Sequence, residues 1–313
     1  MFIPKEIKMV LPKEILFSIE QSANLDNGHT LQEIRIRNKR PLMIKTNQGN
    51  VCIQLKDKDY IVSAEQMSEI VALLSGYSLY AFEDELRQGF ITIAGGHRVG
   101  FCGKAIMERG AVKTLRKISS VNIRVAKEVK GCASQWMPYL YENDRLCHTL
   151  IISPPGCGKT TLLRDMICHV SNGWGNYAGE TIGVVDERSE ISPMVNGICQ
   201  MDVGVSTDVL EGCPKAEGML LLLRSMGPEV IAVDELGRVA DFTALESLLH
   251  AGVTVLATVH GNDMDELRGN PNLRNLIERH VFERYIFLSK KNGVGTVESI
   301  MSCDKKLLYG KEG

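Results

Sequence analysis

The hydrophobic positions of this chain follow two different patterns. In roughly the first 130 residues, apolar and polar positions alternate, as in E-I-R-I-R at residues 33–37. The alternation in residues 89–105 predicts two strands that are joined by a turn at Gly95-Gly96. From Thr149 onward, short apolar runs alternate with helical patterns, which is typical of a parallel sheet with helical crossovers. The pattern therefore predicts a small α+β domain with an antiparallel sheet, followed by an α/β domain.

Finer features of the pattern place the individual elements. In the first domain we expect helices at residues 1–27 in part, 63–76 and 80–88, and a further strand at 121–126. A helix at residues 133–141 and the polar residues 142–145 suggest a linker. In the second domain we expect strands at residues 150–153, 181–186, 230–234, 253–258 and 284–288, and helices after Lys159, at 216–226 and at 242–250. The predicted organisation is an N-terminal α+β domain at 1–135, a linker at 136–148, an α/β domain at 149–302 and a flexible tail at 303–313.

The second domain begins with T-L-I-I-S-P-P-G-C-G-K-T-T-L-L at residues 149–163. A short apolar run is followed by prolines and glycines and then by a helical pattern, so the segment predicts a strand, a phosphate loop and a helix. Ser153 stands where the pattern G-x-x-x-x-G-K-[ST] has its first glycine. The residues expected to contact a nucleotide here are Ser153, Pro154, Pro155, Gly156, Cys157, Gly158, Lys159, Thr160 and Thr161.

Each residue type in this loop suits a phosphate group. Gly156 and Gly158 let backbone N–H groups turn toward an anion, and the N-terminus of the next helix adds its dipole. Lys159 would bring a positive charge to the β- and γ-phosphates, and Thr160 would offer its hydroxyl to Mg²⁺. The loop therefore predicts ATP and Mg²⁺ as cofactors.

Polar residues follow three of the predicted strands at their carboxyl ends, where ligands bind in an open parallel sheet. After one strand we expect Asp234 to hold Mg²⁺ and Glu235 to polarise the attacking water. After a second strand, Asp186 and Glu187 are expected to face the nucleotide, and after a third, His260 could respond to the γ-phosphate. Each also has a structural interpretation, because such acids often belong to solvated turns or helix caps, and His260 could be a structural histidine.

Composition limits the remaining classes of protein. The chain has 313 residues, of which 44% are hydrophobic and 24% charged, as in an ordinary globular protein large enough for two domains. The nine cysteines are scattered without C-x-x-C pairs, which favours a reducing compartment. Cys157 could be a redox switch, but a free thiol at a permissive loop position is the preferred interpretation. The N-terminus does not resemble a signal peptide, and no apolar run approaches the ~20 residues that span a bilayer. We therefore expect a cytoplasmic protein without direct membrane insertion.

The order of the motifs resembles that of the secretion-superfamily ATPases. These carry a phosphate loop, an acidic box, a Walker B segment of the L-R-x-x-P-[DE] type and a histidine box, which match residues 153–160, 184–190, 223–235 and 251–260. Within the superfamily, the chain is similar over nearly its whole length to the stage III sporulation ATPases of endospore-forming bacteria. The segments that carry this second resemblance are residues 33–37, 95–100, 122–126, 208–215 and 223–226.

The resemblance implies a RecA-like core, a ring hexamer, and an N-terminal domain that closes over the nucleotide. It also implies an ATPase of the mother-cell cytoplasm, working beneath a membrane channel complex between mother cell and forespore. Because a transferring phosphoryl group usually needs an arginine as well as a lysine, we consider Arg98, Arg124, Arg188, Arg224 and Arg238. Arg98 is favoured because it follows the Gly95-Gly96 turn on a predicted strand. The predicted catalytic set is Glu235, Lys159, Arg98, Arg224 and His260.

Two other functions compete with a secretion ATPase. A RecA-like helicase or packaging motor would share fold and motifs. However, a net charge of -2 and 6% aromatic residues do not suggest the positive groove and stacking rings that a nucleic-acid track needs. A nucleotide-gated scaffold that binds ATP without turnover would not need the water-polarising carboxylate of Glu235.

Overall fold

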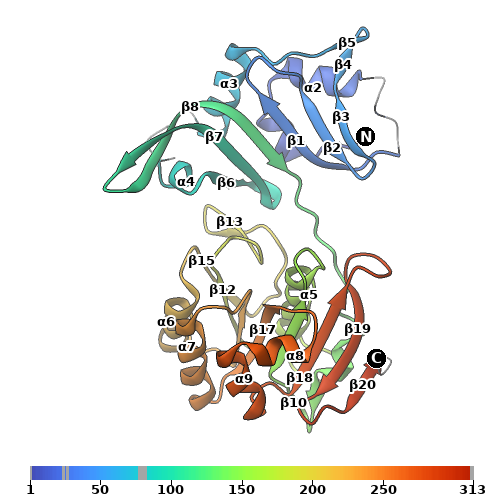
Figure 1. The fold of residues 1–313 in the computed structure, drawn as a ribbon, viewed down its shortest axis with the longest axis vertical. Helices are drawn as coiled ribbons and strands as arrows, with labels where there is room; N and C mark the ends of the chain where they lie inside the picture. Colours follow the sequence, from blue (N-terminus) through green and yellow to red (C-terminus); the bar gives the residue numbers. More distant parts are fainter. Residues whose placement is uncertain (1, 23–24, 26–27, 77–82, 311–313) are drawn as a thin grey trace. The chain divides into compact units, whose positions relative to one another are not determined.

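The computed structural model describes residues 2–22, 25, 28–76 and 83–310, and it divides the chain into two compact units (Figure 1). These are Met1–Lys127 and Glu128–Gly313. The boundary between the units thus lies after residue 127, whereas the sequence suggested that the first domain ends at residue 135. In the part of the chain that is described, no helix is long and apolar enough to cross a membrane.

The N-terminal unit is built on a six-stranded antiparallel sheet in the order β3-β2-β1-β8-β7-β6 (Figure 1). Its strands are β1 (Leu31–Arg37), β2 (Met43–Thr46), β3 (Gly49–Cys52), β6 (Phe90–Ile93), β7 (His97–Glu108) and β8 (Ala111–Arg124). The short strands β4 (Gln54–Leu55) and β5 (Lys58–Asp59) pair with each other. Within the alternating stretch 33–37, Ile34 and Ile36 are fully buried, as the two-residue period predicts.

Helices supply the other side of this N-terminal core. They are α1 (Lys5–Met9), α2 (Lys13–Glu20), α3 (Ala64–Leu74) and α4 (Glu83–Gln88). The predicted helix at 1–27 is interrupted because Pro12 cannot continue α1 and instead occupies the N-cap of α2. The predicted capping box is present, with Gln66 N donating to Ser63 Oγ at 3.2 Å and Ser63 N to Gln66 Oε1 at 3.1 Å. Of the helix predicted at 80–88, residues 80–82 lie outside the described residues.

Strands β7 and β8 form a hairpin longer than the sequence suggested. Their pairing continues from Arg98 opposite Arg124 to Glu108 opposite Ala111. We call residues 103–117 the outer hairpin. Its exposed cations are Lys104, Arg109, Lys113, Arg116 and Lys117. The two-residue alternation was obscured here because both faces of the ribbon carry polar residues.

The C-terminal unit contains an eight-stranded sheet in the order β15-β12-β16-β17-β11-β18-β19-β20. Strands β15 to β18 in this order are parallel, and the last two pair antiparallel. Their bounds are β11 (Thr149–Ser153), β12 (Ile182–Asp186), β15 (Thr207–Glu211), β16 (Val230–Val233), β17 (Thr254–His260), β18 (Arg284–Ser289), β19 (Thr296–Ser302) and β20 (Leu307–Gly310). The predicted α/β class with a mainly parallel sheet is confirmed.

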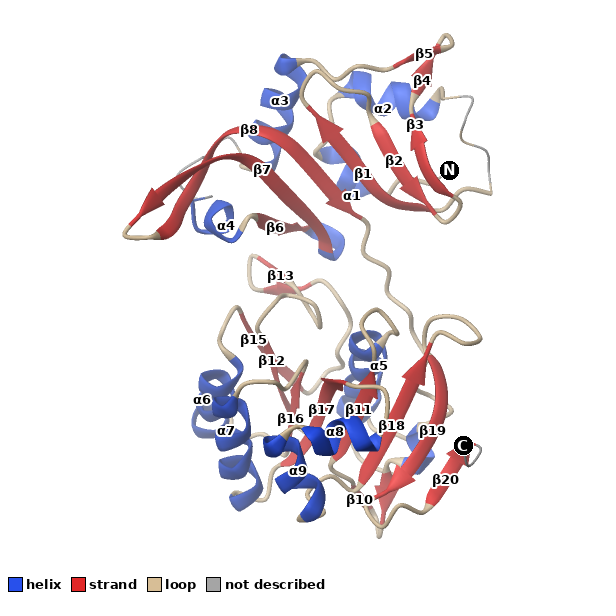
Figure 2. Ribbon diagram, in the orientation of Figure 1, coloured by secondary structure: helices blue, strands red, loops and turns tan. Residues whose placement is uncertain are grey.

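Helices cover both faces of this sheet (Figure 2). They are α5 (Lys159–Asn172), α6 (Lys215–Ser225), α7 (Val239–His250), α8 (Met264–Gly269) and α9 (Pro271–Glu278). Successive strand residues enter opposite cores: Ile151 packs in the core that holds α5, and Leu150 and Ile152 pack in the core that holds α6, α7 and α9. The small pair β13 (Met194–Val195) and β14 (Ile198–Cys199) lies in the connection from β12 to β15.

The linker predicted at residues 136–148 is wrong, because this segment is part of the C-terminal core. Ala133, Met137 and Leu140 are fully buried, in a stretch with a 3-10 turn at Met137–Tyr139 in place of the expected helix. The segment continues into the hairpin of β9 (Tyr141–Glu142) and β10 (Arg145–Leu146). Asp165 of α5 fixes its start by accepting from the backbone N–H groups of Gly131 at 2.8 Å and Ala133 at 2.6 Å.

The flexible tail predicted at 303–313 is also wrong over residues 307–310. This stretch forms β20, which pairs antiparallel with β19 and extends the sheet. The ring of Tyr309 lies 4.7 Å from that of Trp136, centroid to centroid, in an edge-on contact. The apolar residues of D-K-K-L-L-Y-G were too few to suggest a strand on their own.

Ending the chain after Ser302 should therefore destabilise the C-terminal unit by about 2 kcal/mol, because β19 loses β20, one of its two partner strands, and Trp136 loses an aromatic contact. Thermal unfolding of this variant is to be compared with that of a chain ending after Gly310, which keeps every described strand. Equal melting temperatures for the two chains would show that β20 contributes nothing to stability.

Candidate nucleotide-binding site

The phosphate loop leaves the sheet at Ser153, the last residue of β11, and enters α5 at Lys159. Gly156 and Gly158 adopt left-handed backbone angles, with φ of 71° and 93°. At Gly158 a Cβ would also come within 3.3 Å of Val294 Cγ1, so this position favours glycine on two grounds. Gly158 is the N-cap of α5 and has no side-chain cap, which leaves the first N–H groups of this long helix directed at the loop.

Ser153 replaces a glycine without strain. It is the last residue of a regular strand, so its backbone does not need the left-handed region that glycine favours. Its side chain is buried, and Oγ donates to the carbonyl oxygen of Pro154 at 2.8 Å. Cys157 is also buried and packs in the core around α5, which fits a structural thiol better than a redox switch.

The Lys159 ammonium group is buried and folded back over its own loop. Nζ donates to the Ser153 carbonyl oxygen at 2.9 Å and to Nδ1 of His260 at 2.9 Å. Burial lowers the pKa of Lys159, and the carboxylates of Asp234 and Glu235 partly oppose that shift. A phosphate anion in the loop would oppose it further and favour the charged form.

Asp234 directly follows β16 and contacts Thr160, the second residue of α5 after the phosphate loop. Its Oδ2 accepts from Thr160 Oγ1 at 2.5 Å, and its Oδ1 accepts from the hydroxyl of Thr258 on β17. The Thr160 hydroxyl and the Asp234 carboxylate thus lie side by side, as hard oxygen donors for Mg²⁺ would. The two residues predicted as metal ligands are therefore neighbours, and their binding of Mg²⁺ stays a prediction. The bond from Thr258 to Asp234 depends on the register of β16 against β17, which the sequence alone does not reveal.

Glu235 is held by three contacts. Its Oε1 accepts from His260 Nε2 at 2.8 Å, its Oε2 from Arg188 at 2.8 Å, and its backbone N donates to Thr258 Oγ1 at 2.9 Å. Its backbone is left-handed, with φ of 54°, which is unfavourable for a residue with a Cβ. With Nδ1 accepting from Lys159 and Nε2–H donating to Glu235, His260 forms a bridge between the two predicted catalytic groups.

Asp186 lies at the end of β12 and is almost completely buried. Its carboxylate accepts from three backbone N–H groups of the following loop, those of Glu190 at 2.8 Å, Ile191 at 3.0 Å and Ser192 at 2.9 Å. Burial raises the pKa of Asp186, and these three hydrogen bonds oppose the shift. The same loop is fixed from α5 by Arg164, which donates to the carbonyl oxygens of Glu190 and Ile191.

Glu187 is paired with cations instead. Its carboxylate contacts Lys215, the first residue of α6, and lies 3.3 Å from Arg238 Nη1. Burial by itself would raise the pKa of Glu187, but Lys215, then Arg238, outweigh it and hold that pKa below its usual range. One small pocket is lined by Asp186, Glu187, Arg188, Glu190, Lys215, Asp234 and Glu235. The two acidic strand ends therefore meet, although direct contact of Asp186 and Glu187 with a nucleotide stays a prediction.

The five arginines considered lie in three places, and two of them, Arg98 and Arg124, belong to the N-terminal unit. Arg188 and Arg238 contact the acids of the site. Arg224 is not brought there: it is near the C-terminal end of α6, which begins at the site with Lys215 and runs to the opposite edge of the sheet, and its Nε donates to Leu220 of its own helix at 3.1 Å. Arg98 lies in the N-terminal unit, with its guanidinium 3.5 Å above the Phe90 ring, so its role at the phosphates stays a prediction.

The C-terminal unit and its phosphate loop define a RecA-like P-loop fold of the kind seen in solved ATPase structures. Over 97% of this chain and 83% of the other, the TM-score is 0.59 with the ATPase DotB of Yersinia pseudotuberculosis, at 12% identity. With the pilus retraction motor PilT, solved with bound ADP, it is 0.57 over 95% and 83% of the two chains, at 17% identity. At these identities the likeness establishes the fold.

The chain belongs to the family described as "Sporulation stage III, protein AA", whose model matches residues 4–307. It is 44% identical over 311 residues to the stage III sporulation protein AA of Bacillus subtilis (strain 168), and the match covers 98% of each chain. The resemblance expected from the motifs is thus confirmed at the level of the family.

Replacing Asp186 by alanine should destabilise the protein by about 3 kcal/mol, because three backbone N–H groups lose their acceptor. Asp186→Asn keeps one acceptor oxygen and should lose less. Denaturant unfolding measures the difference, and hydrogen exchange at residues 190–192 localises it. The control is Asp208→Ala, which removes an exposed carboxylate on the neighbouring strand β15. Reduced ATP affinity with unchanged stability would instead favour a nucleotide-facing Asp186.

Proposed function

We propose that this protein is a Mg²⁺-dependent ATPase of the secretion type, acting as a homo-oligomeric ring, expected to be a hexamer. It would work in the mother-cell cytoplasm and energise a sporulation channel between mother cell and forespore through membrane partner proteins. The observation that carries the enzymatic part is the contact chain from Lys159 through His260 to Glu235, beside the pair Thr160 and Asp234. A lysine, an oxygen pair for a metal and a held carboxylate are the groups that phosphoryl transfer to water requires.

Each residue would have a defined task during hydrolysis. Phosphate oxygens entering the loop compete with the Ser153 carbonyl and His260 for Lys159, so nucleotide binding would release the lysine from its present contacts. Mg²⁺, when bound beside Thr160 and Asp234, would neutralise charge on the β- and γ-phosphates. Glu235 would orient and polarise the attacking water, while His260 keeps that carboxylate turned toward the loop.

The comparisons support the class of function. The relative from Bacillus subtilis is named as a sporulation protein, and the structural neighbours are named as an ATPase and as a pilus retraction motor with ADP. A nucleic-acid motor would share this fold, so we propose measuring ATP turnover with and without single-stranded DNA or RNA. Stimulation by nucleic acid would favour that alternative over a secretion motor.

Glu235→Gln should still bind ATP and should lower turnover by roughly 10²–10⁴-fold, because it removes the group that polarises water. Lys159→Ala should instead lose affinity for the phosphates. Nucleotide binding and phosphate release are measured separately for each variant, with the exposed-face variant Glu278→Gln as control. Unchanged turnover in Glu235→Gln would contradict the assignment and leave the scaffold interpretation.

We further propose that Arg98 acts at the phosphates of a neighbouring subunit. Arg98→Ala should then lower turnover by about 10³-fold with little change in ATP affinity, whereas Arg116→Ala on the outer hairpin should not. Turnover per subunit should also rise with protein concentration as the ring assembles.

Mixing subunits tests whether the arginine acts between neighbours. In a mixture of Arg98→Ala and Lys159→Ala chains, some interfaces join an intact Lys159 of one subunit to an intact Arg98 of the next. Activity should reappear in the mixture if the site is shared. An inactive mixture that still forms mixed oligomers would rule out the shared site.

A further inference from the structure

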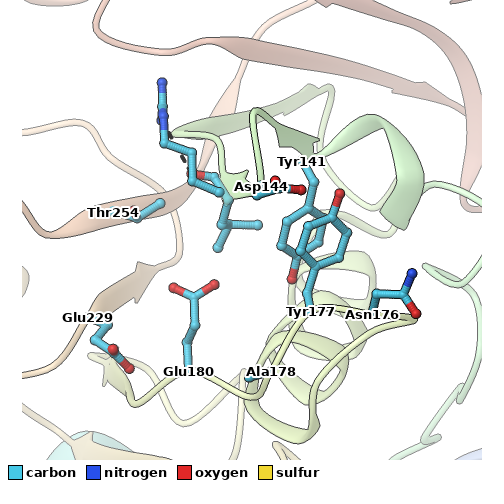
Figure 3. Close-up of a pocket in the computed structure, with 10 residues that line it drawn as sticks. Tyr141, Asp144, Asn176, Tyr177, Ala178, Glu180, Glu229 and Thr254 are labelled. Carbon is cyan, nitrogen blue, oxygen red and sulfur yellow. Dashed lines mark hydrogen bonds between the residues drawn. The ribbon is translucent and has the colours of Figure 1, made fainter.

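A second cavity lies in the C-terminal unit, away from the phosphate loop, with a volume of about 510 Å³. Its wall includes Tyr141, Asp144, Tyr177, Glu180, Glu229 and Thr254, whose side chains surround one space in Figure 3. This volume is within the range of small-molecule sites in proteins.

The cavity lies at the amino-terminal edge of the parallel strands. Glu180 comes just before β12, Glu229 just before β16, and Thr254 is the first residue of β17. The phosphate loop, Asp234 and His260 follow the carboxyl ends of the same set of strands. The two sites are therefore separated by the length of the sheet, and the nucleotide chemistry does not use this cavity.

The charges around the cavity are mainly negative. Asp144, Glu180 and Glu229 contribute carboxylates to its wall. The one cation among the wall residues, Arg145, is paired with Glu283, with Nη1 2.9 Å from Oε2 and a second contact from Nη2 to Oε1. The positive charge of Arg145 is thus already balanced, and no other residue in the described wall of the cavity is a cation that could compensate the three carboxylates.

Glu180 is the carboxylate most in need of a partner. It is half-buried, and among the described residues its side chain has no hydrogen-bond or ion-pair partner. Burial, followed by the nearby charge of Glu229, raises the pKa of Glu180. Glu229 by contrast accepts from Thr181 N at 2.8 Å and from Thr181 Oγ1 at 3.0 Å. Figure 3 shows the Glu180 carboxylate directed into the open space of the cavity.

Tyr141 gives an independent sign of a ligand. The residue is only 8% exposed, and within the described residues its hydroxyl has no hydrogen-bond partner. A buried polar group without a partner costs free energy, so such groups usually have a function or a missing partner. The ring stacks on Tyr177, with centroids 3.9 Å apart and planes within 10°, and this stack forms an aromatic wall of the cavity beside Glu180.

We propose that this cavity binds an organic cation, an amine or guanidinium group carried on a short apolar or planar segment. The N–H groups of the cation would donate to the Glu180 carboxylate and the Tyr141 hydroxyl, and its carbon segment would lie against the stacked rings. Asp144 and Glu229 would add long-range attraction at the entrance.

Two sources could present such a cation. One is a free small amine. The other is a lysine or arginine of a second copy of this chain, for which the outer hairpin offers exposed cations, among them Lys104, Arg109 and Arg116. Both sources share the chemistry that the cavity recognises, so the experiment must distinguish them.

The first experiment measures binding to the full-length protein without nucleotide, by calorimetry. The probes are agmatine, which carries both an amine and a guanidinium group, spermidine, and uncharged 1,4-butanediol. Agmatine or spermidine should bind saturably and the diol should not. Glu180→Gln should weaken binding by at least about tenfold, and the control Glu278→Gln should leave it unchanged. Lys159→Ala should bind as tightly as the original chain, so this test is independent of ATP hydrolysis.

Tyr141→Phe separates a ligand contact from a structural role. Removing the hydroxyl should weaken cation binding several-fold without lowering the melting temperature, because the hydroxyl has no partner to lose. A melting temperature that falls while binding is unchanged would show that the hydroxyl serves the fold.

A synthetic peptide of residues 103–118 then identifies the source. Displacement of bound agmatine by this peptide, but not by one with its lysines and arginines replaced by glutamine, would assign the cation to a second copy. Binding of the small amines alone would assign it to a free amine. The proposal is overturned if neither the amines nor the peptide binds saturably, or if Glu180→Gln binds them with unchanged affinity.

Discussion

The site depends on keeping the ammonium group of Lys159 buried and charged. Burial lowers the pKa of Lys159, and an unpaired charge in such a place would cost several kcal/mol. The protein compensates with acceptors from the ends of two adjacent strands, the carbonyl of Ser153 on β11 and the imidazole of His260 on β17, which are direct neighbours in the parallel register. The order of the strands, more than the loop, therefore decides where the charge lies. In the proposed ATPase, a bound phosphate would replace these acceptors by stronger ones at the same place.

Glu235, which follows β16, is linked to the buried Lys159 through His260, so a third strand takes part in placing this charge. Its left-handed backbone, with φ of 54°, is a strained conformation for which about 1–3 kcal/mol is typical, and it persists because Thr258 and His260 hold both ends of the residue. An extended backbone after β16 would continue the alternation of the strand. The turn at Glu235 instead brings its carboxylate to His260. The strained backbone therefore belongs to the same residue that we propose to polarise the attacking water.

Much of this arrangement could be predicted from the sequence, because buried parallel strands are continuous apolar runs and the glycine-rich loop has a fixed pattern. The sequence-based predictions that were wrong failed for physical reasons. The polar residues 142–145 suggested that residues 136–148 are a linker. Met137 and Leu140 are nevertheless fully buried in the core around α5, a contact between segments that no local pattern reveals. The ion pair of Glu187 with Lys215 also joins segments that are distant in the sequence. A lysine at the start of a helix does not by itself indicate which carboxylate it contacts.

The adjacent acids Asp186 and Glu187 illustrate why a motif alone does not assign a role. Because Asp186 is the last residue of β12, its side chain stays inside and satisfies the backbone of the next loop, whereas Glu187 is already beyond the strand and meets Lys215 and Arg238. The same reasoning applies to whole helices. Since α6 begins at the carboxyl edge of the sheet, its first residue serves the site and Arg224, near its end, is carried to the other edge. A parallel sheet thus has two chemically distinct edges, and polar residues before its strands, such as Glu180 and Glu229, belong to a separate site from those that follow them.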